Sequence, residues 1–155
     1  MLTVYGILKF LHVLSVIFWI GGIGGLSVIT LRVARERNRE ALSLLLRHAT
    51  FYGQWLVGPA SLVVLLTGLA MVGSAHIGFG TFWVLWGFGG LVVHFLMGGF
   101  VLRRRTMDLA RLASVQVGAD DTALAGASRR LWQMQLLYLV LLASVVAAMV
   151  LKPTL

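Results

Sequence analysis

The chain has 155 residues, of which 59% are hydrophobic and only 12% are charged, and its mean hydropathy is +0.94. A soluble domain carries about 45–50% apolar residues, so a core of this size could not hide so much apolar surface from water. The sequence has no cysteine, which excludes disulfides, iron–sulfur clusters and thiolate metal sites. The composition therefore predicts an integral membrane protein.

Four apolar runs are long enough to cross a bilayer, because a membrane-spanning helix needs about 20 apolar residues. They cover about residues 4–31, 50–72, 79–102 and 131–151. We expect one all-α domain, residues 1–155, folded as a four-helix bundle in the membrane. Residues 105–117 are expected to form an interfacial helical extension of the third helix. Pro59 lacks a backbone donor, so it is predicted to kink the second span.

The formal net charge of +8 is concentrated between the apolar runs. All arginines and all acidic residues lie in segments 32–47 and 103–130. Such a charge suggests nucleic acid in a soluble protein, but basic residues in short connections between spans mark the cytoplasmic face. We therefore expect the lipid bilayer as partner and no nucleic acid, with both basic connections in the cytoplasm and both termini outside.

Glycine occurs at 18 positions and creates small faces on several predicted helices. Without a Cβ atom, helices approach closely and gain packing contacts that lipid cannot match. We expect these faces to pack within the bundle, and the alternative is a homodimer or docking onto a larger membrane complex. The glycines concerned are Gly21, Gly22, Gly25, Gly87, Gly90 and Gly98.

Histidines near or within the spans are the main functional candidates, because ionisable side chains are costly in the bilayer. At 1.5 Å of rise per residue, His12 and Met71 lie near the outer ends of their spans and His94 lies in the inner half. His12 and His94 then differ in height by roughly 16 Å, which is too far for both to ligate one haem iron. His76 belongs to the connection after the second span. His12, His76 and Met71 therefore form a candidate cluster whose ligand types suit copper or a haem iron.

Each of these residues also has a purely structural interpretation. His12 could hydrogen-bond to Ser15 or to a backbone carbonyl, and His94 could bond to Gln54 or Gln135 on another helix. His76 would then be a solvated residue, and Met71 would fill the core. The sequence alone leaves these alternatives open.

Four stretches carry a resemblance over nearly the whole chain: "LKFLHVLSVIFWIGG", "LVVLLTGLAMV", "SRRLWQMQLLYL" and "AAMVLKP". They resemble a family of predicted integral membrane proteins of unknown function. That family is similar to a wider four-helix group that includes the copper-resistance D domain and the HemJ-type protoporphyrinogen IX oxidases. The shared features are the first-span Leu11-His12 with Trp19 and its following glycines, Gly68 in the second span, and the closing Lys152-Pro153. The resemblance and the charge bias together imply the cytoplasmic (inner) membrane of a bacterium.

In the HemJ-type enzymes the first-span histidine binds haem b, and a third-span lysine near a "WxxxK" segment is the other key residue. The resemblance gives His12 the role of the haem ligand. The corresponding third-span stretch here, "TFWVLWGFGG", has Trp86 or Gly87 where the lysine would stand. The Pro-Arg segment that follows the first span in those enzymes is also absent. The resemblance thus implies haem binding and argues against the oxidase activity.

Three functional hypotheses follow. The first is a small haem b protein with a redox or electron-transfer role near the outer face, with His12 as ligand and His76, Met71 or His94 as further candidates. The second is a cofactor-free accessory or structural subunit of a membrane complex. The third is a copper-handling protein that uses His12, His76 and Met71.

Overall fold

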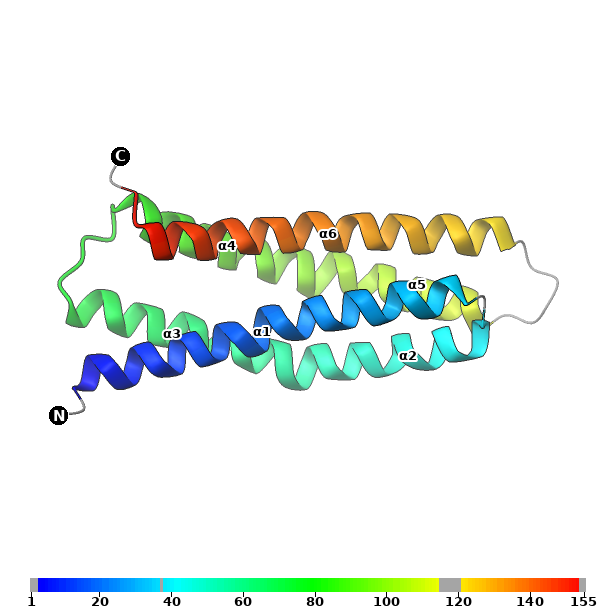
Figure 1. Cartoon of the computed structure of the whole chain (residues 1–155), viewed down its shortest axis with the longest axis horizontal. Coiled ribbons are helices and arrows are strands. Elements are labelled where there is room, and N and C mark those ends of the chain that lie inside the picture. The colour runs from blue at the N-terminus through cyan, green and yellow to red at the C-terminus, as the bar shows by residue number, and fades with distance from the viewer. Residues whose placement is uncertain (1–2, 37, 115–120, 154–155) are drawn as a thin grey trace.

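The structure is a computed structural model that describes residues 3–36, 38–114 and 121–153, and the described residues are helical apart from short connections. Figure 1 shows the helices running side by side along the long axis of the molecule. In chain order the elements are α1 (Val4–Arg35), α2 (Arg39–Tyr52), the π-helical segment η1 (Gly53–Val57), α3 (Gly58–Ser74), α4 (Phe82–Leu96), the π-helical segment η2 (Met97–Leu102), α5 (Arg103–Ser114) and α6 (Asp121–Leu151).

Because α2, η1 and α3 are continuous, as are α4, η2 and α5, the chain forms four long helical rods. All four are long and apolar enough to cross a membrane: Val4–Arg35, Arg39–Ser74, Phe82–Ser114 and Thr122–Leu151. Large apolar side chains face outward on each rod, as at Ile17, Leu66, Val92 and Val140. Lipid is the solvent that such surfaces need, so the predicted all-α, four-helix membrane bundle is confirmed.

The connections divide the bundle into two ends. At one end of the bundle, α1 and α5 end and α2 and α6 begin (Figure 1). Val4 and Leu151 lie at the opposite end. We call the first the basic end, because its exposed residues include Arg32, Arg35 and Arg111. The two arginine-rich segments therefore lie on the same side of the bundle, as the charge pattern predicts.

The helices extend beyond the predicted spans at the basic end. α2 starts at Arg39, and Asn38 caps it by accepting a hydrogen bond from the Ala41 backbone N–H at 3.0 Å. α5 forms the predicted interfacial extension as far as Ser114, and the rest of segment 105–117 lies outside the described residues. α2 and α5 pack on one another through buried apolar residues and a 3.3 Å hydrogen bond from the Ser43 hydroxyl to the Ala110 carbonyl. The buried apolar residues on these two helices are Leu42, Leu46, Leu109, Ala110 and Ala113.

The second and third rods each contain one π-helical segment among the described residues. In the second rod the cause is local: Pro59 has no N–H, so the Trp55 carbonyl loses its usual partner four residues on. The Gly58 N–H bonds to the Gly53 carbonyl five residues back, which is the π-helical pattern. In the third rod η2 contains the Gly98-Gly99 pair. Where the sequence predicts a kink at Pro59, the structure has a π-helical turn directly before it.

The glycines divide into buried and open positions. A Cβ atom at Gly22 would lie 2.7 Å from the Tyr52 hydroxyl, and one at Gly90 would collide with Val145 of α6. Gly87 likewise faces Met149, so α4 and α6 approach closely through glycine, as predicted. Gly21 and Gly25, by contrast, have no atom within 4 Å of their Cβ positions.

Replacing Gly90 by alanine is expected to destabilise the bundle by about 1–3 kcal/mol, because the added methyl group overlaps Val145, whose β-branched side chain is stiff in a helix. The matched control is Gly89→Ala, because a Cβ atom there meets nothing within 4 Å. That variant is expected to be neutral or slightly stabilising. Unfolding in mixed micelles of increasing SDS content, followed by circular dichroism, measures both. Equal stability of the two variants would show that α4 and α6 do not pack this closely.

Candidate functional site

His12 lies on α1 and faces α3. Its Nδ1 atom is 3.0 Å from the Thr67 hydroxyl oxygen, and its Cε1 atom is 3.4 Å from the position that a Cβ atom on Gly68 would take. Glycine at position 68 therefore lets the imidazole lie directly against the backbone of α3. The ring is half-buried between the two helices, and its partners are the Thr67 hydroxyl and the Val64 backbone rather than Ser15.

The hydrogen bonds of Thr67 determine which nitrogen of His12 carries the proton. The Thr67 hydroxyl donates to the Val63 carbonyl at 2.6 Å, and a hydroxyl has only one hydrogen to donate. It must therefore accept from His12, so Nδ1–H is the donor. In the neutral ring Nε2 then holds the lone pair, and besides Thr67 the ring has one further hydrogen-bond partner in the described part of the chain, the Val64 backbone. This is the arrangement of a histidine that binds a metal through Nε2 while a neighbouring group orients it through Nδ1.

The other members of the predicted outer cluster are not joined to His12. Met71 lies one helical turn beyond Thr67 on α3 and is half-buried, and His76 is exposed in the α3–α4 connection, where its φ is 52°. Within residues 3–36, 38–114 and 121–153, no hydrogen bond links His12 to Met71 or His76, and no group of three His, Cys, Asp or Glu side chains could hold a metal ion.

A buried polar network lies about two helical turns further along α1. The Trp19 indole N–H donates to Nδ1 of His94 at 3.2 Å, and the Tyr138 hydroxyl also bonds to this nitrogen. The three residues come from α1, α4 and α6 and are almost completely buried. His94 thus makes bonds between helices, as its structural interpretation predicts, but to Trp19 and Tyr138 instead of Gln54 or Gln135.

His94 has the opposite tautomer to His12. An indole N–H can only donate, so Nδ1 of His94 is an acceptor and the proton of the neutral ring is on Nε2. A protonated nitrogen has no lone pair for a metal. Two helical turns, roughly 10 Å, separate the levels of His12 and Trp19 on α1, which keeps the two histidines in separate sites. We therefore do not assign His94 as a ligand of the same cofactor as His12.

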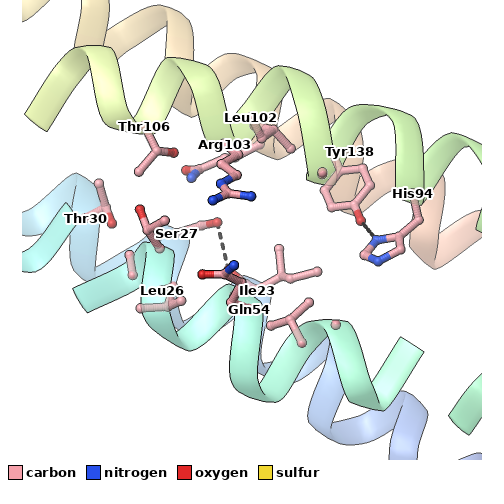
Figure 2. A pocket seen from close by; sticks show the side chains of 18 of the residues that line it. Ile23, Leu26, Ser27, Thr30, Gln54, His94, Leu102, Arg103, Thr106 and Tyr138 are labelled. Atoms are coloured by element: carbon pink, nitrogen blue, oxygen red, sulfur yellow. Dashed lines mark hydrogen bonds between the residues drawn. The ribbon is translucent and has the colours of Figure 1, made fainter. Parts of the chain in front are cut away.

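A cavity of about 320 Å³ opens beside His94 and extends toward the basic end (Figure 2). All four rods line it, and both π-helical segments contribute wall residues, including Gln54 from η1 and Gly98 from η2. A Cβ atom on Gly98 would be 3.6 Å from both the Tyr138 hydroxyl and Cε1 of His94, so this glycine leaves the network open to the cavity. π-Helical turns are rare and are frequent at functional sites.

The sequence also contains a signal for this cavity, in the spacing of polar residues other than histidine. Each of three otherwise apolar runs contains a pair of polar residues. The two members of each pair are three or four positions apart, so they share one face of the helix. The pairs are Ser27 with Thr30, Thr50 with Gln54, and Gln135 with Tyr138, and all six residues line the cavity.

Comparison with known proteins found one matching family model and nothing among the curated proteins or the solved structures. The model is that of the predicted integral membrane protein family DUF2269, and it matches residues 6–153, which include all four rods. The chain therefore belongs to the DUF2269 family of predicted integral membrane proteins, which confirms the resemblance carried by its first-span, second-span and C-terminal stretches.

Proposed function

We propose that this protein binds haem b through Nε2 of His12 and has a redox or electron-transfer role near the membrane face opposite the basic end. The observation that carries the proposal is the hydrogen-bonded pair of His12 and Thr67. It leaves an imidazole lone pair free between α1 and α3, and the donor type suits a haem iron.

The surroundings of His12 fit an axial ligand. Thr67 fixes the ring orientation and the tautomer, and Gly68 leaves room for the ring against α3. Such outer-shell partners are important for metal affinity. Haem b, when bound, supplies one-electron chemistry at its iron. The chain would contribute the ligand nitrogen, its orientation and an apolar environment, which are the means by which a protein adjusts a haem.

The position of His12 supports a role close to one membrane face. It lies about two turns from the beginning of α1, at the end of the bundle that carries the termini. Basic connections remain preferentially in the cytoplasm, so we infer that this end faces outward and that the protein resides in a bacterial inner membrane.

Oxidase chemistry of the HemJ type is not proposed, because the third-span positions that correspond to the lysine serve packing. The Trp86 indole N–H donates to the Ser144 hydroxyl at 3.3 Å, and Gly87 faces Met149. Neither residue can ionise, so neither can replace the ammonium group of a lysine.

The absorption spectrum of the purified protein tests the proposal. Protein from haem-replete cells is expected to show a Soret band and, after reduction with dithionite, the α and β bands of haem b. The pyridine haemochrome assay measures the haem content, and about one haem per chain is expected. Protein without a Soret band, even after reconstitution with haemin, would rule out the haem proposal. Copper bound to such haem-free protein would favour a copper-handling role instead.

An accessory subunit is the second candidate, and the open glycines of α1 favour it. Gly21 and Gly25 have no neighbour within 4 Å and lie four residues apart on one helix face, so a helix of another chain could approach them closely. Purification in a mild detergent, with cross-linking through Gly25→Cys in native membranes, tests this. A cross-linked homodimer or a stoichiometric second protein would support the candidate, and an entirely monomeric chain in native membranes would oppose it.

A further inference from the structure

The cavity at the basic half of the bundle is chemically distinct from the His12 site. Polar side chains line part of its wall, including the hydroxyls of Ser27, Thr30 and Thr106 and the amide of Gln54, and no acidic residue lies among the lining side chains (Figure 2). Its volume of about 320 Å³ is at the lower end of the range for small-molecule pockets. An occupant therefore meets a largely apolar wall with a few polar groups and no carboxylate.

Arg103 supplies a cation at one end of this cavity. It is the first residue of α5 and lines the cavity wall, while the residue as a whole remains exposed at the basic end. Figure 2 shows its guanidinium group pointing into the cavity between Thr106 and Gln54. Within the described residues no carboxylate pairs with Arg103. A guanidinium with free N–H groups binds carboxylates and phosphates through two parallel hydrogen bonds.

His94 supplies a donor at the other end. Its Nδ1 accepts from the Trp19 indole N–H, so in the neutral ring Nε2 carries the proton. No hydrogen bond to Nε2 is found within the described residues, and no buried polar side-chain atom among them lacks a partner. Nε2 is therefore not sealed off, and His94 is one of the residues that line the cavity (Figure 2).

We propose that this cavity binds a small acidic amphiphile, with its carboxylate or phosphate held by Arg103 and its uncharged part reaching toward His94. The nine residues between the two side chains correspond to roughly 13 Å along the rod, so the two groups contact different parts of one molecule. Arg103 is exposed and lies on the part of its rod nearer the basic end, so an acid in the aqueous phase or the headgroup of an acidic lipid can reach it. It uses none of the His12 contacts, so it does not depend on haem binding.

Ligand-induced stabilisation of the full chain in phosphatidylcholine nanodiscs tests the site. Thermal unfolding is followed while hexanoate, hexyl phosphate or uncharged hexanol is added. A ligand that binds only the folded state raises the unfolding midpoint in a saturable way. One or both acids are expected to do so and hexanol is not. A second series of nanodiscs contains phosphatidylglycerol, which separates an acidic lipid from a free acid as the source of the anionic group.

The matched variants are Arg103→Gln and Arg104→Gln. Each removes one positive charge from an exposed position, but only Arg103 lines the cavity. Arg103→Gln is expected to weaken the stabilising effect on the order of tenfold or more, and Arg104→Gln to leave it unchanged. Arg103→Lys should restore it in part, because the charge returns without the paired N–H groups. The proposal is overturned if no acid or acidic lipid stabilises the chain in a saturable way, or if the two glutamine variants respond equally. Neither variant is expected to lose haem. A negative result for the acid-binding cavity is therefore distinguishable from a negative result for haem binding at His12.

Discussion

Replacing His12 by alanine is expected to abolish haem binding, with at least a tenfold loss of the Soret absorbance per chain. The reason is specific to the tautomer: Nδ1 of His12 donates to Thr67, and Nε2 alone retains a lone pair for iron. The measurement is the haem content of protein expressed in haem-replete cells and purified in mild detergent. Added imidazole should restore part of the absorbance in His12→Ala, because a free imidazole can occupy the space of the lost ring.

Two further histidine variants make this result diagnostic. His48→Ala is the matched control, since His48 is exposed on α2 at the basic end and should not affect haem content. His94→Gln is expected to keep the haem, because the hydrogen bond from Trp19 leaves His94 without a free lone pair in its neutral form. If His94→Gln lost the haem while His12→Ala kept it, the assignment of His12 as the haem ligand and of His94 as a structural hydrogen-bond partner would be wrong.

Thr67→Val probes the orienting hydrogen bond separately from the ligand. Valine keeps the shape of threonine but cannot accept from Nδ1–H of His12. Loss of an outer-shell partner typically lowers metal affinity by about 10–100-fold, so haem should be retained less tightly rather than lost. Transfer of haem to apomyoglobin measures this, and release from the variant is expected to be faster than from the unaltered protein. A variant with unchanged release would show that Thr67 does not orient the ligand.

The membrane architecture is the part of the fold that the sequence predicts best, for a physical reason. The bilayer core dictates the length of an apolar span and requires every backbone polar group to be bonded within it, so apolar runs of this length fold as spanning helices. The charge segregation then places the connections. At the basic end the apolar runs do not mark the full length of the helices, because α2 and α5 bury only one face, although the extension after the third span is predicted.

The partners of the candidate residues could not be predicted from local sequence. Ser15 lies one helical turn from His12 on the same helix, whereas the actual side-chain partner, Thr67, is 55 residues away in the chain. Whether Thr67 meets His12 depends on how α1 and α3 are rotated about their own axes. The sequence gives little information about this rotation, because the lipid-facing and protein-facing sides of each helix are both apolar. The same uncertainty explains why His94 meets Trp19 and Tyr138 instead of a glutamine.

The ionisable residues within the predicted spans do not indicate the cavity, because most of its wall is formed by apolar residues and glycines, with hydroxyl and amide side chains among them. The charge pattern of the sequence explains Arg103 as a topology signal only, whereas in the structure Arg103, the first residue of α5, also lines the cavity. The two π-helical turns that border the cavity arise from Pro59 in one rod and accompany a glycine pair in the other. Helical periodicity analysis assumes a constant turn, so it does not predict where the helices widen.

Trp19→Ala is expected to be the most destabilising single substitution in the bundle, at about 3–5 kcal/mol. Trp19 is only 3% exposed, its ring contacts His94 edge to face at 4.5 Å between centroids, and its N–H is bonded to His94. Removing the indole leaves a void between three helices that lipid cannot fill, and it removes a hydrogen-bond donor from His94. Unfolding in SDS mixed micelles measures the loss.

The matched control is Trp86→Ala, because Trp86 is 41% exposed on the lipid-facing side of α4 and also donates one hydrogen bond, to Ser144. Lipid or detergent chains can occupy the space that it leaves, so a loss of about 1 kcal/mol, the usual net value of one hydrogen bond, is expected. Trp19→Phe should fall between the two, since phenylalanine retains most of the packing but has no N–H to donate. A loss for Trp86→Ala as large as that for Trp19→Ala would mean that the Trp19–His94–Tyr138 network is not the packed centre of the bundle.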